Sequence, residues 1–307
     1  MCRFSERNAI LRINRLAAGA TTLAVAATGI AAAAVPGTAA AKSKAVTLVG
    51  SGSSAAQTYV QDLFAAYHRL HPNVSFTYNP DGGNAGVKDV QAGRSQFAIQ
   101  TSQPSASAGH TTWDQLFLDA VTIDVNRANA LRTISIPSVA DIFLGVDTSW
   151  SSVKGSSLST TIDPVGRNST AGLYTIFSKA VLGGATQSSN VAQEASDGLV
   201  ATAVGKDNNA IGYIGLANSH KSGIRALGLS AKNSGTAYAP TVANIKLWAR
   251  DQAKHKSGGY PLTHFDWVVL PQGKKNATVN AFFAWVIHSA AAGRVLNSAG
   301  AVPYFNQ

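Results

Sequence analysis

Cysteine is almost absent from this sequence. The only one among its 307 residues is Cys2, which lies ahead of a long apolar run. A bacterial lipoprotein carries its lipidated cysteine after such a run, so Cys2 does not predict a lipid anchor. Once the start of the chain is removed, no thiol remains. Disulfide bonds and cysteine metal sites are therefore excluded, and the core alone must stabilise the fold.

Charged residues are also scarce, at 13% of the sequence, but they are unevenly balanced, with 25 Lys and Arg against 15 Asp and Glu. Residues 1–41 contain four of the basic residues and one of the acidic ones, so the remainder holds 21 against 14, a net charge of about +7. This balance favours an anionic ligand or a polyanionic cell wall. The basic residues neither cluster nor alternate with aromatic residues, as a nucleic-acid groove requires, so no nucleic-acid partner is expected.

Signatures of catalysis and of metal binding are missing as well. No Gly-x-Ser-x-Gly elbow with a following acid and histidine occurs, so the sequence offers no hydrolase nucleophile. Of the seven histidines, His68 and His71 share a predicted helix without a third ligand, and there is no His-Glu-x-x-His motif. We therefore expect no enzyme, no metal site and no cofactor, and we expect the five tryptophans to pack in the core.

Residues 1–41 have the pattern of a signal peptide. Basic residues precede an Ala-rich apolar run from Leu16 to Val35, and small residues follow at Gly37–Ala41, where a signal peptidase would cut. The predicted location is extracytoplasmic: secreted, in the periplasm or at the cell surface. Because about 20 apolar residues can just span a bilayer, a retained membrane anchor is the alternative. The weak hydrophobicity of so Ala-rich a run favours cleavage.

From Ala45 onward, β-rich runs alternate with helical stretches. The pattern predicts strands at Val46–Val49, Val74–Tyr78 and Phe97–Ile99, with helices at Ala55–His71 and Val87–Gln91 between them. The expected cap of the first helix is Ser53 or Ser54. This order implies a parallel sheet with ligand sites beyond the carboxyl ends of its strands. Later segments continue the alternation, with predicted helices at Ala171–Leu182 and Val279–Ala291 and predicted strands at Ala210–Ile214 and Trp267–Leu270.

Three short loops each open a predicted helix: Gly50–Ser54, Gly82–Gly86 and Arg167–Gly172. A helix start presents unpaired backbone N–H groups and the positive end of the helix dipole, which together stabilise a small oxyanion without a full positive charge. One such loop is usually only a turn with a cap. The order and spacing of all three favour an anion site.

Several short segments are similar to those of one known family. Gly50–Ser54 is similar to its Gly-x-Gly-x-Thr turn, Gly82–Lys88 to its Gly-Ser-x-x-Gly-Val-Lys turn, and Asp141–Gly145 with Trp150 to its Asp-Ile-Phe-x-Gly-x-x-x-x-Trp stretch. Looser matches occur at Gln96–Pro104, Ala210–Ile214 and Tyr260–Leu262. Over nearly all of its mature length the chain resembles the phosphate-binding proteins of bacterial ABC importers.

The resemblance implies an α/β, two-lobed periplasmic-binding-protein-like fold of type II, with central mixed sheets flanked by helices and a ligand cleft between the lobes. Residues 42–123 plus 262–307 would form lobe 1 and residues 124–261 lobe 2, with crossover strands near Val121–Val125 and Tyr260–Phe265. Such a protein is a monomer that catalyses nothing. It captures its solute, here phosphate or a related oxyanion, and delivers it to an ABC permease.

Carried over from the family, the predicted ligand-binding residues are Ser53, Ser54, Gly83, Asn84, Ser102, Arg167, Ala171 and Gly172. Ser54 stands in place of a phosphate-binding Thr, and Arg167 matches an ion-pairing Arg whose fork suits an oxyanion. Gly83 replaces a ligand-binding Ser, with Asn84 beside it as a substitute donor. The Arg-x-x-x-Ser-Gly-Thr motif has lost two hydroxyls, because Ala171 and Leu173 stand in their places. As the alternative, Arg167 is a structural ion-pair residue.

The largest departure from the family is Ser102, which stands where a carboxylate reads the proton of phosphate. A serine also donates, so discrimination against sulfate should weaken; Asp81 is a possible substitute. Phosphate is the leading ligand, and another oxyanion or a small polar solute is an open alternative. The alternative function is a secreted or cell-surface protein that uses a divergent form of this fold for adhesion, sensing or cell-wall binding, without phosphate transport.

Overall fold

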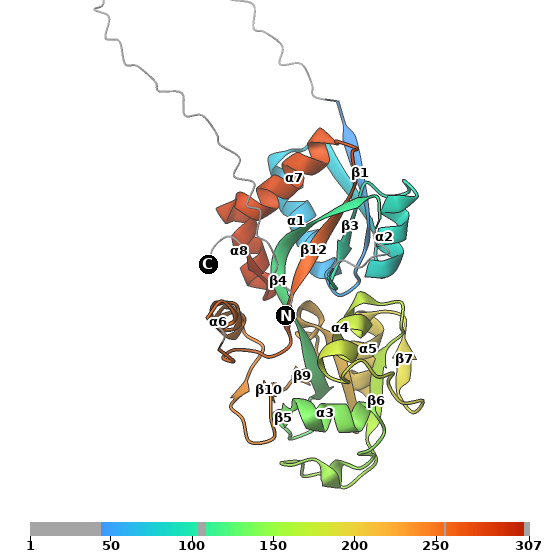
Figure 1. Cartoon of the computed structure of the whole chain (residues 1–307), viewed down its shortest axis with the longest axis vertical. Helices are drawn as coiled ribbons and strands as arrows, with labels where there is room; N and C mark the ends of the chain where they lie inside the picture. Colours follow the sequence, from blue (N-terminus) through green and yellow to red (C-terminus); the bar gives the residue numbers. More distant parts are fainter. Residues whose placement is uncertain (1–43, 104–108, 255, 304–307) are drawn as a thin grey trace, which may run out of the picture. The chain divides into compact units, whose positions relative to one another are not determined.

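Hydrophobic strands and an amphipathic helix open the described part of the chain, which comprises residues 44–103, 109–254 and 256–303 of a computed structural model (Figure 1). The elements are β1 (Val46–Gly52), α1 (Gln57–Leu70), β2 (Val74–Asn79), α2 (Gly83–Gln91) and β3 (Phe97–Gln100). As predicted, β2 and β3 pair with β1 in parallel. The predicted signal peptide at residues 1–41 lies outside the described residues.

Two predicted helix starts and one predicted helix are wrong in detail. The N-cap of α1 is Ala56, while the Ser53 hydroxyl accepts a hydrogen bond from the Ala56 N–H at 3.3 Å. Helix α2 begins at Gly83 instead of Val87, because only Gly82, with a φ of 104°, lies in the turn. In place of the last predicted helix, the structure has two helices, α7 (Ala277–His288) and α8 (Ala290–Ala299). They meet at Ser289, the N-cap of α8.

The long strand β4 (Thr111–Asn126) changes partners along its length (Figure 1). Its first part, from Thr111 to Ala120, pairs antiparallel with β12 (Thr263–Pro271). From Val121 onward it pairs with β8 (Ala210–Gly215) and β9 (Ile224–Ala226). The change falls within two residues of the predicted crossover and makes β4 the continuous element of the mixed sheet, whose order is β2-β1-β3-β12-β4-β8-β6-β7.

The other elements extend the sheet and cover it. Strand β6 (Asp163–Arg167) lies in parallel between β8 and β7 (Ala192–Glu194). A smaller sheet contains β5 (Thr133–Ser135), β10 (Gly228–Ser230) and β11 (Ala237–Tyr238). The remaining elements are α3 (Ile136–Phe143), the 3-10 turn η1 (Trp150–Ser152), α4 (Gly172–Ala180), α5 (Asp197–Lys206), the 3-10 turn η2 (Leu216–Asn218), α6 (Val242–Gln252) and β13 (Val302–Pro303).

Aromatic residues fill two large hydrophobic clusters. In one, Phe64 stacks on Phe76, and Phe282 contacts both rings. In the other, Phe177 stacks on Tyr213 with ring centroids 3.8 Å apart. Trp150 is fully buried there, and its indole N–H donates to the Asn209 carbonyl at 2.9 Å. Of the five tryptophans predicted to pack in the core, the other four are only half-buried.

The helices of the described residues are short. None is by itself long and apolar enough to cross a membrane; only α7 and α8 taken together meet that test, across a bend of 71°.

A buried acid on β4 makes stability depend on pH. Asp124 is 1% exposed; its Oδ2 accepts a hydrogen bond from the Thr122 hydroxyl at 2.5 Å, and its Oδ1 has no partner among the described residues. Burial raises the pKa of Asp124 to about 7. The folded state therefore holds this proton between about pH 4 and pH 7, where the unfolded chain has lost it, so stability falls as pH rises through that window.

We expect Asp124→Asn to unfold with the wild-type free energy at pH 4 and to be more stable than the wild type by roughly 1–3 kcal/mol at pH 8, because the amide cannot ionise. Urea unfolding at both pH values measures this difference. Asp62→Asn, at an exposed position on α1, is the matched control and should leave the pH dependence unchanged. If the free energies of unfolding of Asp124→Asn and the wild type differ by the same amount at every pH in this range, Asp124 is not the group that makes stability depend on pH.

Candidate functional site

The N-termini of the eight α-helices of the described residues fall into two groups. Five begin with a residue whose side-chain oxygen caps the first turn: Ser135 at α3, Ser196 at α5, Thr241 at α6, Asn276 at α7 and Ser289 at α8. The other three, α1, α2 and α4, begin at Ala56, Gly82 and Ala171, and have no side-chain cap. Because Ala and Gly have no side-chain oxygen, these three starts keep backbone N–H groups available.

The starts of α2 and α4 face each other. A Cβ built on Gly82 would lie 3.5 Å from the Thr170 carbonyl oxygen, just before α4. A Cβ on Gly83 or on Gly172 would overlap the same group, the side-chain amide of Gln100. Glycine at both positions therefore allows the two helix starts to approach the end of β3 closely.

The turn before α1 joins the same region. A Cβ on Gly86 of α2 would lie 2.6 Å from the Gly52 Cα, so α2 packs directly on the end of β1. The side chains of Ser53 and Ser54 are both buried. The Ser54 hydroxyl accepts a hydrogen bond from Arg167 Nη1 at 3.0 Å, which connects this turn to the end of β6.

Arg167 is 2% exposed, and the protein itself engages most of its guanidinium. Nη1 pairs with Asp197 and also donates to Ser54, Nε donates to the Glu194 carbonyl at 3.2 Å, and Nη2 donates to the Ala195 carbonyl at 2.9 Å. Of the five N–H groups of an arginine, one on Nη2 is left without an acceptor among the described residues. Arg167 therefore forms a buried ion pair with Asp197, and one of its N–H groups remains for a ligand.

Asp197, the first residue of α5, is the partner of Arg167 that the sequence patterns did not indicate. It is fully buried: Oδ1 accepts from Arg167 and from the Ser54 hydroxyl at 3.5 Å, and Oδ2 accepts from the Gly215 N–H at 2.6 Å. Its charge neutralises that of Arg167. The region around the helix starts therefore relies on backbone N–H groups and hydroxyls for attraction of an anion.

Gln100 was also not predicted, although it lies at the centre of the convergence. Its Oε1 accepts from the backbone N–H groups of Thr101 at 2.9 Å and Ser102 at 3.3 Å, and its Nε2 donates to Asn84 Oδ1 at 2.9 Å. The Thr101 hydroxyl is buried and lacks a hydrogen-bond partner within the described structure. It lies close to Gly172, since a Cβ built on that glycine would be 2.5 Å from the Thr101 hydroxyl oxygen. An unpaired buried hydroxyl beside two uncapped helix starts is a candidate ligand group.

Of the remaining predicted residues, Ser102 is half-buried and Asn84 exposed, and both line a surface pocket of about 410 Å³ together with Gln100, Lys88 and Thr175. Ala171 and Gly172 are buried at the start of α4. Seven of the eight predicted residues thus lie at these three helix starts or bond to them, and Ser102 lines the same pocket as Asn84.

Asp81 does not replace the missing carboxylate. Its side chain accepts a hydrogen bond from Asn79 Nδ2 at 3.0 Å, and burial together with the nearby Asp89 raises its pKa. Both acids line a different pocket, with Arg94 and Ser95. The carboxylate that contacts Ser54 and Arg167 is that of Asp197, and both of its oxygens already accept hydrogen bonds.

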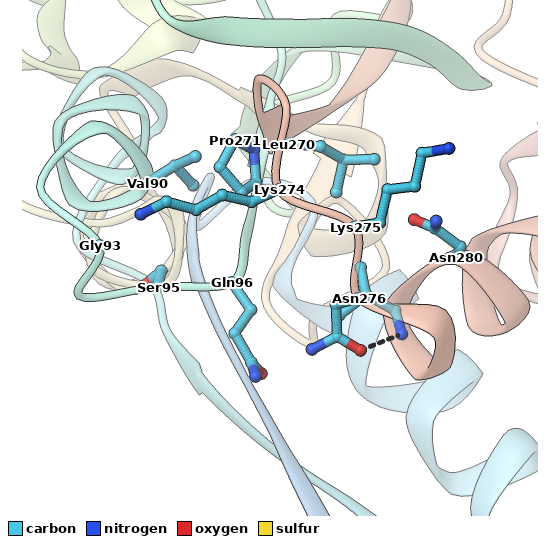
Figure 2. Close-up of a pocket in the computed structure, with 11 residues that line it drawn as sticks. Val90, Gly93, Ser95, Gln96, Leu270, Pro271, Lys274, Lys275, Asn276 and Asn280 are labelled. Carbon is cyan, nitrogen blue, oxygen red and sulfur yellow. Dashed lines mark hydrogen bonds between the residues drawn. The ribbon is translucent and has the colours of Figure 1, made fainter.

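A pocket of about 200 Å³ at the start of α7 offers a weaker anion site (Figure 2). Lys274 and Lys275 line it, but Figure 2 shows their side chains pointing in different directions. Asn276 Oδ1 already accepts from the N–H groups of Thr278 at 3.0 Å and Val279 at 3.1 Å. Since the helix start is capped, it has little to offer an anion.

Solved structures share this architecture. A putative phosphate ABC transporter substrate-binding protein with bound phosphate from Clostridium perfringens superposes with a TM-score of 0.72 at 17% identity, covering 84% of this chain and 99% of that one. The predicted fold class, a mixed α/β binding-protein fold, is therefore confirmed.

A family model described as the PBP superfamily domain matches residues 37–290, so the chain belongs to that superfamily. Among curated proteins, phosphate-binding protein PstS 2 of Streptococcus pneumoniae is 26% identical over 104 residues, which cover 34% of this chain and 36% of that protein. Protein SphX of Synechococcus elongatus is 26% identical over 192 residues, which cover 60% of this chain and 53% of SphX. The chain thus matches about a third of the first relative's length and about half of the second's.

Proposed function

We propose that this chain is an extracytoplasmic solute-binding protein that holds phosphate or a related oxyanion at the starts of α1, α2 and α4. The observation that carries the proposal is that these three helices alone, among the eight in the described residues, lack a side-chain cap. The starts of α2 and α4 lie against Gln100, and the Ser53 N–H before α1 donates to the Ile99 carbonyl at 2.8 Å, so all three lie near the end of β3. Uncapped helix N-termini stabilise a negative charge, and Arg167 with Asp197 adds no net charge of its own. The names of the relatives and of the fold neighbours support phosphate as the ligand.

In this proposal the ligand is held by backbone N–H groups and by small hydroxyls. The donors are the first-turn N–H groups of Gly83, Asn84 and Gly172, with the hydroxyls of Ser53, Ser54, Thr101 and Ser102. Ala171 lies beside them, but its own N–H donates to the Asn168 carbonyl at 3.2 Å. Arg167 fixes Ser54 and contributes at most one N–H. Because Gln100 lies between Gly83 and Gly172, we propose that its amide moves aside or donates to the ligand when phosphate enters.

The proposal extends to the setting of the protein. Lobe 1 would comprise residues 42–123 plus 262–307 and lobe 2 residues 124–261, joined where β4 changes partners and at the start of β12. The chain would act as a monomer without catalytic activity after removal of residues 1–41, and it would deliver its solute to an ABC permease. Closure of the lobes over the ligand and their opening would control capture and release.

The test of the proposal is calorimetric titration of the purified protein with phosphate, arsenate and sulfate at pH 7.5. We expect phosphate and arsenate to bind. Sulfate should bind with an affinity within about tenfold of that for phosphate, because the described site has no free carboxylate to accept a hydrogen bond from a protonated ligand oxygen. Absence of binding by all three oxyanions would reject the function.

Ser102→Asp is expected to widen the preference for phosphate over sulfate by at least about tenfold, because a fixed carboxylate accepts a hydrogen bond from the O–H of phosphate and repels sulfate, which has no proton. Ser102→Ala is the control, and its preference should stay near that of the wild type. If Ser102→Asp lowers the affinity for phosphate and for sulfate equally, residue 102 does not contact the protonated oxygen of phosphate.

A further inference from the structure

Three polar side chains form a buried cluster on the paired strands β4 and β12, separate from the groups assigned to phosphate. Asp119 and His264 are directly opposite each other in the antiparallel ladder, and Asp266 follows two residues after His264, on the same face of β12. Asp119 and Asp266 are fully buried, and the His264 side chain is 10% exposed. One ligand-type atom from each lies within 4.8 Å of the other two.

The cluster contains acceptors and no donor to satisfy them. Asp119 Oδ2, both oxygens of Asp266 and His264 Nε2 have no hydrogen-bond partner in the described part of the chain. His264 Nε2 lies 3.8 Å from Asp266 Oδ1. Buried carboxylate oxygens without donors are costly, so this arrangement calls for a positively charged species between the three side chains.

The surrounding contacts orient these atoms inward. His264 Nδ1 lies 3.4 Å from the Leu262 carbonyl oxygen, which favours the proton on Nδ1 and leaves the Nε2 lone pair facing the carboxylates. Asp119 Oδ1 accepts from the Tyr59 hydroxyl at 2.8 Å and from the Ala120 N–H at 2.7 Å, which fixes the carboxylate and leaves Oδ2 toward the cluster. Such outer contacts are typical of metal-binding side chains.

We propose that Asp119, His264 and Asp266 bind one divalent transition-metal ion, with Zn²⁺ as the fitting species. One neutral imidazole nitrogen and two carboxylates are a donor set that Zn²⁺ accepts, whereas Mg²⁺ prefers oxygen ligands and keeps its waters. The ligand atoms would close in by a modest movement to reach zinc-ligand distances. The ion enters from the side of His264, which carries the exposed fraction of the cluster. It ties β4 to β12 beside the point where β4 changes partners.

The test uses the purified protein, stripped of metal with a chelator, in phosphate-free buffer at pH 7.5. Calorimetric titration with ZnCl₂ measures binding, and thermal unfolding with and without ZnCl₂ measures the change in Tm. We expect one Zn²⁺ per chain and a rise in Tm, and no rise with MgCl₂. His264→Gln and Asp266→Asn should each weaken Zn²⁺ binding by at least about 100-fold, since loss of supporting contacts alone costs 10–100-fold. His220→Gln, at an exposed histidine, is the control and should bind Zn²⁺ as the wild type does.

Two results would overturn the proposal: a wild-type protein whose heat and Tm do not respond to Zn²⁺, or equal Zn²⁺ affinity in His264→Gln and the wild type. If Asp266→Asn fails to fold, His264→Gln decides. If Asp266→Asn is more stable than a wild type that binds no Zn²⁺, the two acids share a proton and the metal site is rejected. Because phosphate is absent from these titrations, their outcome is independent of phosphate binding.

Discussion

Arg167→Ala is expected to abolish phosphate binding and to lower the free energy of unfolding by about 3–5 kcal/mol. The stability loss follows because Asp197, fully buried, would keep its charge without its partner. The binding loss follows because an uncompensated carboxylate beside Ser54 repels an anion, and because Ser54 loses the donor that positions it. Calorimetry with phosphate and chemical denaturation measure the two effects separately.

The double variant Arg167→Ala with Asp197→Asn separates charge from folding. Asparagine keeps an oxygen for the Gly215 N–H while removing the buried charge, so the double variant should recover most of the stability lost in Arg167→Ala. It should still bind phosphate more weakly than the wild type, since Ser54 is no longer held. An Arg167→Ala protein with wild-type phosphate affinity would remove this residue from the site.

Gly172→Pro is expected to weaken phosphate binding by roughly 10- to 100-fold relative to Gly172→Ala. Proline deletes the first N–H of α4, and one hydrogen bond to a charged group contributes about 1.5–3 kcal/mol. The helix itself tolerates proline at its first position, and Ala171 already has the extended conformation that precedes proline, with φ −76° and ψ 135°.

Gly172→Ala is the matched control because it adds the same Cβ beside Gln100 and Thr101 but retains the N–H. Both variants should show similar Tm values. Calorimetric titration with phosphate gives the affinities. Equal affinities for the alanine and proline variants would mean that the start of α4 gives no backbone donor to the ligand, and the helix-start proposal would fail at this position.

Local patterns in the sequence are sufficient to predict most of the strands and helices. β1, β3 and β8 are largely apolar runs and β2 alternates between apolar and polar residues, each with turn residues beside it. The spacing of Tyr59, Leu63 and Tyr67 indicates the buried face of α1. The local pattern is misleading at α2. Gly82-Gly83-Asn84 indicates a turn, but only Gly82 precedes the helix, and Gly83 and Asn84 belong to its first turn. A break such as the one at Ser289 is also difficult to predict, since the apolar pattern continues through it.

The candidate site is predictable only in part, because some of its interactions join residues far apart in the chain. The three helix starts are visible as glycine-rich loops. The pair of Arg167 and Asp197 is not, since 30 residues separate them and a Ser-Asp helix start is common. Gln100 is the last residue of the buried strand β3, where no motif marks it, and its role depends on glycines at positions 83 and 172.

If the chain binds a solute as proposed, the partner change within β4 would limit how that solute leaves. The strand is covalently continuous from Thr111 to Asn126, with β12 hydrogen-bonded to one end and β8 to the other. The two ends therefore cannot slide past each other, and separation of the two proposed lobes would occur as a rotation of the backbone near Ala120 and Val121. Both side chains there are fully buried, so such a rotation would be a coordinated swing of packed residues. The rate of this concerted rearrangement would then set the upper limit on the rate of solute exchange.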